Sequence, residues 1–89
     1  MYQISIGKTG IHTRGDLMRK TDSGWVVVDD DVLNGERLEL LPGSYLYKFY
    51  SVGHGDFEML VREVGGPVVS GPEAHTAPSP RDVFEFQVR

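Results

Sequence analysis

The run Gly53-His54-Gly55-Asp56 comes nearest to catalytic chemistry in this chain. It holds the imidazole of His54 beside the carboxylate of Asp56, a pair of groups that can exchange protons with a substrate. Glycines around a histidine are equally typical of a hairpin tip, where glycine adopts positive φ. No serine stands in a nucleophile-elbow pattern, and the chain has no cysteine. We therefore expect no enzyme, and we keep His54 and Asp56 as binding candidates.

The possible metal ligands of the chain are not spaced as in known metal sites. The three histidines, His12, His54 and His75, fall in predicted turns or loops and lack the paired spacing of zinc ligands. The acidic triplet at 29–31 could offer oxygen ligands to calcium, but it has neither the spaced positions nor the closing glutamate of a calcium loop. A charged strand end that keeps an edge from pairing explains the triplet equally well. We expect no metal and no other cofactor.

Composition limits the class of protein and its partners. The chain has 89 residues, which fits a single domain over 1–89, and 39% of them are hydrophobic. Nine Lys and Arg stand against thirteen Asp and Glu, for a formal net charge of -4, and no basic cluster suited to nucleic acid is present. No apolar run approaches the roughly 20 residues that cross a bilayer. We expect binding to neither nucleic acid nor a membrane.

The compartment is inferred from two features of the sequence. The lack of cysteine favours a reducing environment, because small secreted domains usually depend on disulfides. Residues 1–6 alternate like a strand and have no basic start, long apolar stretch or cleavage site of a signal peptide. We expect a cytoplasmic protein, or one exported only as part of a larger assembly.

Glycine and proline divide the chain into short pieces. The longest stretch without either runs from Trp25 to Asn34, and each glycine or proline inside a helix costs about 1 or 3 kcal/mol. Strands fit these pieces, and apolar residues alternate with polar ones in most of them. The alternation predicts five strands, at 2–6, 37–40, 45–49, 57–62 and 84–88. Two more are predicted at 17–20 and 25–28.

The connections complete the predicted architecture. Segments 45–51 and 56–64 read as a hairpin joined through the glycines of 52–55. The stretch at about 70–80 is rich in proline and has no large apolar residue, so we expect a flexible loop there. The sequence thus predicts an all-β fold, a small antiparallel β-sandwich of immunoglobulin-like type. An SH3-like or other small β-barrel is the alternative.

Segment 40–49 reads Leu40-Leu41-Pro42-Gly43-Ser44-Tyr45-Leu46-Tyr47-Lys48-Phe49. It resembles the L-x-P-G-x-Y-x-Y-K-F segment of glycogen- and starch-binding modules of the β-sandwich type. Upstream, Leu17-Met18-Arg19 and Gly24-Trp25 follow the order of the preceding strands in that family. The family continues x-V-D-G, whereas this chain reads Tyr50-Ser51-Val52-Gly53 and lacks the aspartate. The resemblance implies a β-sandwich and, as a second functional hypothesis, glucan binding.

Aromatic residues carry the functional hypotheses. If Tyr47 and its alternating neighbours face inward, Tyr50 lies on an opposite face that is too apolar to be left open to water. Trp25 with Tyr50 could then form a stacking platform for a sugar or a hot spot for a protein, and Tyr47 is a further stacking candidate. Our leading hypothesis is a non-catalytic interaction or structural module that docks onto a protein partner or self-associates through a sheet edge. Glucan binding is the alternative.

Overall fold

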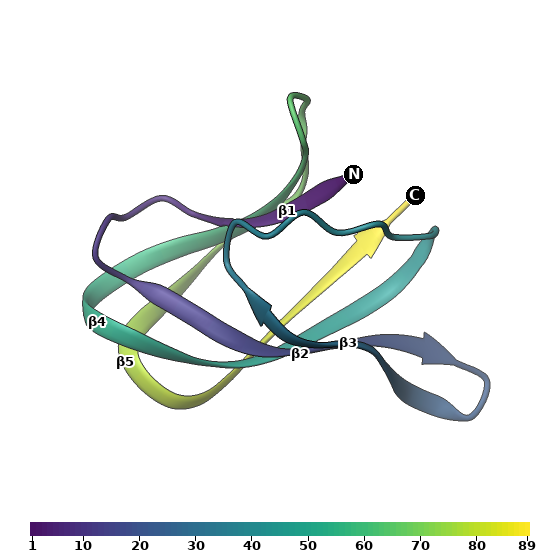
Figure 1. The fold of residues 1–89 in the computed structure, drawn as a ribbon, viewed down its shortest axis with the longest axis horizontal. Helices are drawn as coiled ribbons and strands as arrows, with labels where there is room; N and C mark the ends of the chain where they lie inside the picture. The colour runs from purple at the N-terminus through teal and green to yellow at the C-terminus, as the bar shows by residue number, and fades with distance from the viewer.

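The computed structural model describes residues 1–89 and contains five antiparallel β-strands and no helix (Figure 1). The prediction of an all-β chain is therefore confirmed. The strands pair in the order β1-β4-β2-β3, and β5 pairs with β4 as well. Their bounds are β1 Tyr2–Ile6, β2 His12–Thr21, β3 Gly24–Leu33, β4 Gly43–Glu63 and β5 Val68–Val88.

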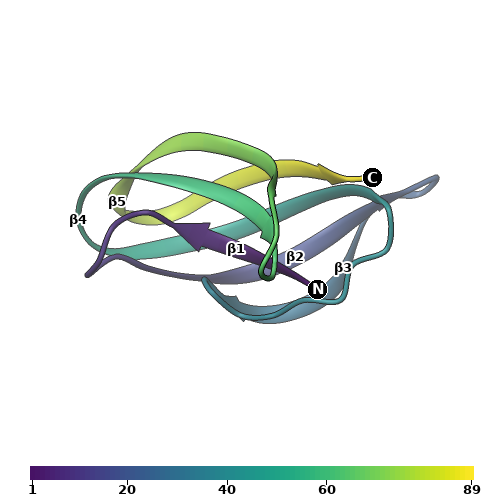
Figure 2. The same cartoon turned by 90° about the horizontal axis from the view of Figure 1, so that it is seen from above.

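Two long strands organise the whole sheet. The first part of β4 pairs with β2 on one side and with the last part of β5 on the other. The last part of β4 pairs with β1 and with the first part of β5. Because β4 and β5 both bend midway, the single sheet curls over itself into a half-barrel (Figures 1 and 2).

The prediction of a hairpin through 52–55 is wrong, because β4 continues through these residues. The strand bends at Gly53 and Gly55, whose φ angles are 103° and 115°. The register of β4 with β5 shifts at the same place. Ser51 lies opposite Ser79 and Gly55 lies opposite Ala77, so β4 has more residues than β5 between these two pairs. A Cβ on Gly53 would stand 2.4 Å from the carbonyl oxygen of Gly10. The two glycines therefore let the strand bend closely past a neighbouring segment and do not reverse it.

The loop predicted at about 70–80 is also wrong, because these residues belong to β5. Three prolines, Pro72, Pro78 and Pro80, lie in this strand. Proline lacks the N–H that a central strand must donate, but it is tolerated where one edge of the strand is unpaired. β5 has β4 as its only partner and therefore offers such an edge.

The remaining predicted strands change in length. Segments 17–20 and 25–28 are parts of β2 and β3, which form a ten-residue hairpin pair. Segment 37–40 is no strand, and only Leu38 forms a bridge, with Tyr2. Gly35 N–H also donates to the carbonyl of Ile4 at 2.8 Å. The connection between β3 and β4 thus runs along the edge of β1 and covers it.

The predicted inward faces are confirmed. Alternate residues of β4 and β5 are buried and join residues of β1, β2 and β3 in one apolar cluster. Two stacked ring pairs lie in it, Tyr45 with Phe86 and Tyr47 with Phe49. The cluster consists of Ile4, Ile11, Leu17, Val32, Leu38, Tyr45, Tyr47, Phe49, Phe57, Met59, Val61, Ala77, Phe84, Phe86 and Val88.

Candidate interaction surface

Tyr47 belongs to the core, so its prediction as a stacking residue is corrected. Its side chain has no exposed surface. The hydroxyl donates to the carbonyl of Val32 at 2.7 Å and lies 3.1 Å from Oγ1 of Thr13. A fully enclosed ring cannot meet a ligand, and its hydroxyl instead ties β4 to β2 and β3.

The burial of Tyr47 predicts a loss of stability in alkali. Burial raises the pKa of Tyr47 to about 12, while an unfolded tyrosine titrates near 10. The native state therefore keeps a proton that the unfolded state loses, so this contribution is complete below about pH 10 and is lost as the pH rises toward 12. We expect the free energy of unfolding to fall by about 3 kcal/mol across this pH range, as measured by urea denaturation.

A Tyr47→Phe variant is the control for the alkaline prediction. It should be less stable than the parent chain at neutral pH by about 1–3 kcal/mol, because Thr13 and Val32 lose a buried partner. Its stability should fall less steeply above pH 10, since the titrating group is gone. Parallel pH curves for the two chains would contradict the role assigned to Tyr47.

Trp25 and Tyr50 do not form one platform. In the register of the sheet, Trp25 lies opposite Lys20 of β2. Tyr50 lies opposite Arg14, near the other end of β2. At roughly 3.3 Å per strand residue, these positions lie about 20 Å apart. Both aromatic side chains are nevertheless partly exposed, 39% for Trp25 and 43% for Tyr50. The two residues therefore belong to separate surfaces.

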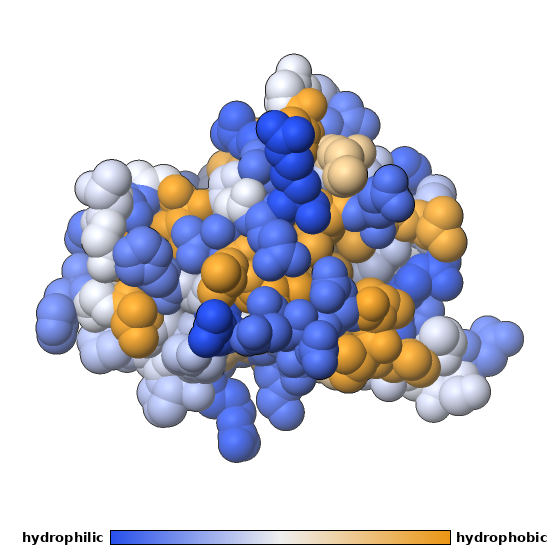
Figure 3. Space-filling view, viewed as in Figure 1, coloured by the Kyte–Doolittle hydropathy of each residue, from blue (hydrophilic) through white to orange (hydrophobic).

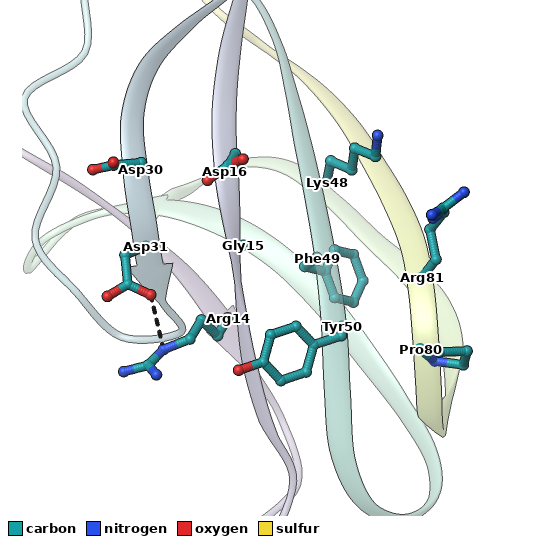
Figure 4. Close-up of a pocket in the computed structure, with 10 residues that line it drawn as sticks. All are labelled: Arg14, Gly15, Asp16, Asp30, Asp31, Lys48, Phe49, Tyr50, Pro80 and Arg81. Carbon is teal, nitrogen blue, oxygen red and sulfur yellow. Dashed lines mark ion pairs between the residues drawn. The ribbon is translucent and has the colours of Figure 1, made fainter.

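Tyr50 lies in an open groove of about 590 Å³ on the outer side of the sheet (Figure 4). Acidic side chains of β2 and β3 stand on one side, and Lys48 and Arg81 stand on the other. Arg14 pairs with Asp31 at 3.0 Å beside the tyrosine ring. The groove combines an aromatic face with several hydrogen-bonding groups, as polar-ligand sites do. The lining residues are Arg14, Gly15, Asp16, Asp30, Asp31, Lys48, Phe49, Tyr50, Pro80 and Arg81.

His54 lies within the bend of β4, between Gly53 and Gly55, and Asp56 follows the bend; both side chains are exposed. The carboxylate of Asp56 accepts a hydrogen bond from the hydroxyl of Thr76 at 2.8 Å. His54 makes no side-chain hydrogen bond and no ion pair with Asp56 or any other residue. The two residues therefore do not form a joined acid–base pair in this structure.

His75 is the polar residue that the sequence analysis missed. The sequence predicts it in a surface loop, yet the structure leaves only 4% of its side chain exposed. Its Nδ1 lies 2.8 Å from the carboxylate of Asp82, and its Nε2 lies 3.0 Å from Glu73 without hydrogen-bond alignment. Phe57 stacks on the ring at a centroid distance of 5.7 Å. Because His75 and Asp82 flank the bend of β5, their contact holds that bend.

The outer half of the β2–β3 hairpin is the most exposed apolar part of the sheet. Four consecutive residues of β3 are 39–53% exposed, namely Trp25, Val26, Val27 and Val28. Neighbouring side chains in a strand point to opposite faces, so both faces of this segment are apolar and open. Figure 3 shows apolar atoms gathered over this arm of the molecule. β3 is also the last strand on its side of the sheet, with β2 as its only partner.

Comparison of the chain with protein-family models, with curated proteins and with solved structures gave no match. No segment of the structure forms a helix with the length and apolar character needed to span a bilayer.

Proposed function

We propose that the protein is a non-catalytic interaction module of the cytoplasm that binds an extended strand of another protein along the open edge of β3. The observation that carries the proposal is the exposure of Trp25 to Val28 on a strand with one unpaired edge. An added strand would receive hydrogen bonds from the backbone of β3 and would cover its apolar side chains on both faces. Both the backbone groups of this edge and its apolar side chains now face water.

The size of the apolar surface supports the same role. Residues of the core already fill the inner face, so Trp25 to Val28 add nothing to that cluster. Each large apolar side chain that leaves water contributes about 1.5–3 kcal/mol when its burial is complete. Partial burial of four neighbouring side chains is therefore sufficient for a specific contact without further reshaping of the sheet.

Partner capture with matched variants tests the proposal. Val27→Lys places a charge in the middle of the edge, and Val83→Lys places the same charge on β5 at a valine of similar exposure, 47% against 53%. We expect an affinity-tagged chain expressed in its own cells to retain its partner with Val83→Lys and to lose it with Val27→Lys. A partner that both variants retain equally would overturn the assignment to β3.

Glucan binding is the second candidate, and the groove around Tyr50 favours it. Polysaccharide binding needs an accessible aromatic face together with groups that bind hydroxyls, and Tyr50 with the charged walls offers both. On a glycogen or amylose resin, Tyr50→Ala should abolish retention, while Trp25→Ala should not, since Trp25 lies about 20 Å away. Free passage of the unaltered chain through the resin would exclude this candidate.

We propose a sandwich of immunoglobulin-like type, with the β2–β3 side and the β1 side as its two layers. The single buried cluster supports it, because Leu17 of β2 and Ile4 of β1 both contribute to that cluster. The shared strands β4 and β5 would then connect the layers at their common edge.

A further inference from the structure

We propose that His75 is a proton-dependent clasp on β5, whose protonated ring binds the carboxylates of Glu73 and Asp82 together and whose neutral ring releases Glu73. Glu73 precedes the histidine by two residues, and Asp82 follows it beyond the bend of the strand. The clasp would make the packing of β5 sensitive to pH. This inference is independent of what binds at the edge of β3.

The ring of His75 joins the two halves of the folded-over sheet. His75 lies opposite Phe57 of β4, after the bend of that strand. Asp82 lies opposite Phe49, before the bend. Nδ1 of the histidine is 2.8 Å from the carboxylate of Asp82, so this contact links residues that pair on either side of both bends.

The two nitrogen atoms of the ring have different surroundings. An ionised carboxylate only accepts hydrogen bonds, so Nδ1 carries the hydrogen that Asp82 receives. Nε2 is buried and makes no hydrogen bond, although Oε1 of Glu73 lies 3.0 Å away. In a neutral ring, Nε2 presents a lone pair to this negatively charged oxygen. A proton on Nε2 would turn the contact into a charge-assisted hydrogen bond.

The surroundings compensate for the burial of a positively charged ring. A buried charge is costly unless it is paired, and here a carboxylate lies on each side of the ring. Phe57 stacks on the imidazole with an angle of 24° between the rings and a centroid distance of 5.7 Å. The face of an aromatic ring attracts a cation at this distance. The protonated histidine therefore has three stabilising neighbours in the core.

Glu73 and Asp82 are the only titratable side chains that contact the ring through a hydrogen bond or an ion pair. On β4, Asp56 and Glu58 flank Phe57 in the sequence, so their side chains point to the opposite face of the strand. Both of these residues are exposed. The charge of the ring is therefore coupled most directly to the two carboxylates of β5.

Glu73 is the part of the clasp that can move. Its side chain is 48% exposed, against 29% for Asp82, which also accepts a hydrogen bond from the N–H of Val83. The register of β4 with the first part of β5 shifts on both sides of Val61. Such irregular pairing weakens a ladder locally. Release of Glu73 would therefore loosen the first part of β5 before any other part of the strand.

The ordinary chemistry of histidine gives the pH range of the device. Histidine is the side chain that normally changes its charge between about pH 5 and 8, where aspartate and glutamate in water stay ionised. Acidification across this range should close the clasp, because it adds the proton that Nε2 needs to bind Glu73. A rise in pH should open it.

Carbon-13 NMR of the labelled chain between about pH 8 and 5.5 tests the clasp. We expect the ring signals of His75 and the carboxyl carbon of Glu73 to change together with one midpoint, while the carboxyl carbon of Glu58 stays constant. In His75→Gln, the Glu73 signal should show no transition in this range. A His75 signal that stays constant, or a Glu73 signal that changes in the same way in both chains, would overturn the inference.

Glu73→Gln provides a second test if His75→Gln fails to fold, because Glu73 lies at the surface. Hydrogen exchange of the amides in 70–76, corrected for the intrinsic effect of pH, should slow about threefold or more from pH 8 to 5.5 in the parent chain. Glu73→Gln should remove most of this change. Glu58→Gln removes the same charge from an exposed position on the other face of β4 and should preserve it. Equal pH dependence of exchange in the two variants would overturn the inference.

Discussion

Gly15→Ala should prevent folding or cost at least about 3 kcal/mol, at the upper end of what overpacking causes. A Cβ on Gly15 would stand 2.1 Å from the carbonyl oxygen of Lys48 and 2.6 Å from Cα of Phe49. Both atoms belong to the backbone of β4, which pairs with β2 at this position. No side chain can move aside to relieve the overlap, so β2 and β4 would have to separate.

The measurement is urea denaturation followed by circular dichroism, with Gly7→Ala as the matched control. A Cβ on Gly7 meets no atom within 4 Å. Gly7→Ala should change the free energy of unfolding by no more than about 0.5 kcal/mol, as exposed substitutions usually do. Since a chain of this size has roughly 4–13 kcal/mol of stability in total, the difference should be plain. Equal stabilities of the two variants would contradict the close packing of β2 on β4.

Phe84→Ala is expected to be the most damaging truncation in the core, with a loss of about 3–5 kcal/mol. Phe84 is 1% exposed, and its ring lies 5.6 Å from that of Phe86 and 6.2 Å from that of His75, between centroids. Its removal would leave a cavity and would also take an aromatic wall from the buried imidazole. Val83→Ala, at the exposed neighbouring position, should cost less than about 1 kcal/mol.

A second substitution separates the two effects of losing Phe84. Phe84→Leu keeps most of the apolar volume, so it should recover more than half of the lost stability. Thermal unfolding of the three variants gives the order directly. If Phe84→Ala and Val83→Ala were equally stable, the inward face of β5 would be assigned wrongly.

The alternation of aromatic and polar residues was sufficient to predict the buried faces. Tyr45, Phe57 and Phe86 all point inward as expected, because a strand with one wet face must follow a period of two. This pattern depends only on local geometry. It is independent of which strands pair with which, and so it could be read from the sequence alone.

Glycine and proline were misinterpreted for a physical reason. Both residues are common in turns, and the sequence does not show that a strand can bend over a neighbour, as β4 does at Gly53, or lie at an edge, as β5 does at Pro78. Their positions thus predicted two breaks in the chain where the structure has two continuous strands. The true length of β4 and β5 depends on pairing across the whole sheet.

The arrangement of the candidate binding residues could not be predicted from the sequence. Trp25 and Tyr50 are both exposed, and their separation follows from the register of β2 with β3 and β4, which composition cannot reveal. The burial of His75 cannot be predicted because the prolines of its segment indicate a loop, and its contact with Asp82 spans a bend that local patterns do not show. A buried histidine is visible from sequence only when its strand is recognised.

The pairing of β1 with the last part of β4 determines the order in which the molecule can be assembled. Tyr2 of β1 lies opposite Glu63 of β4, so β1 leaves the ribosome long before the strand with which it pairs has been made. The β2–β3 hairpin, by contrast, can close as soon as its turn has been made. Until β4 is complete, the apolar side chains of β1 stay in water, so β1 can join the sheet only after the last part of β4 has been made. Such distant pairings slow folding to roughly milliseconds or seconds.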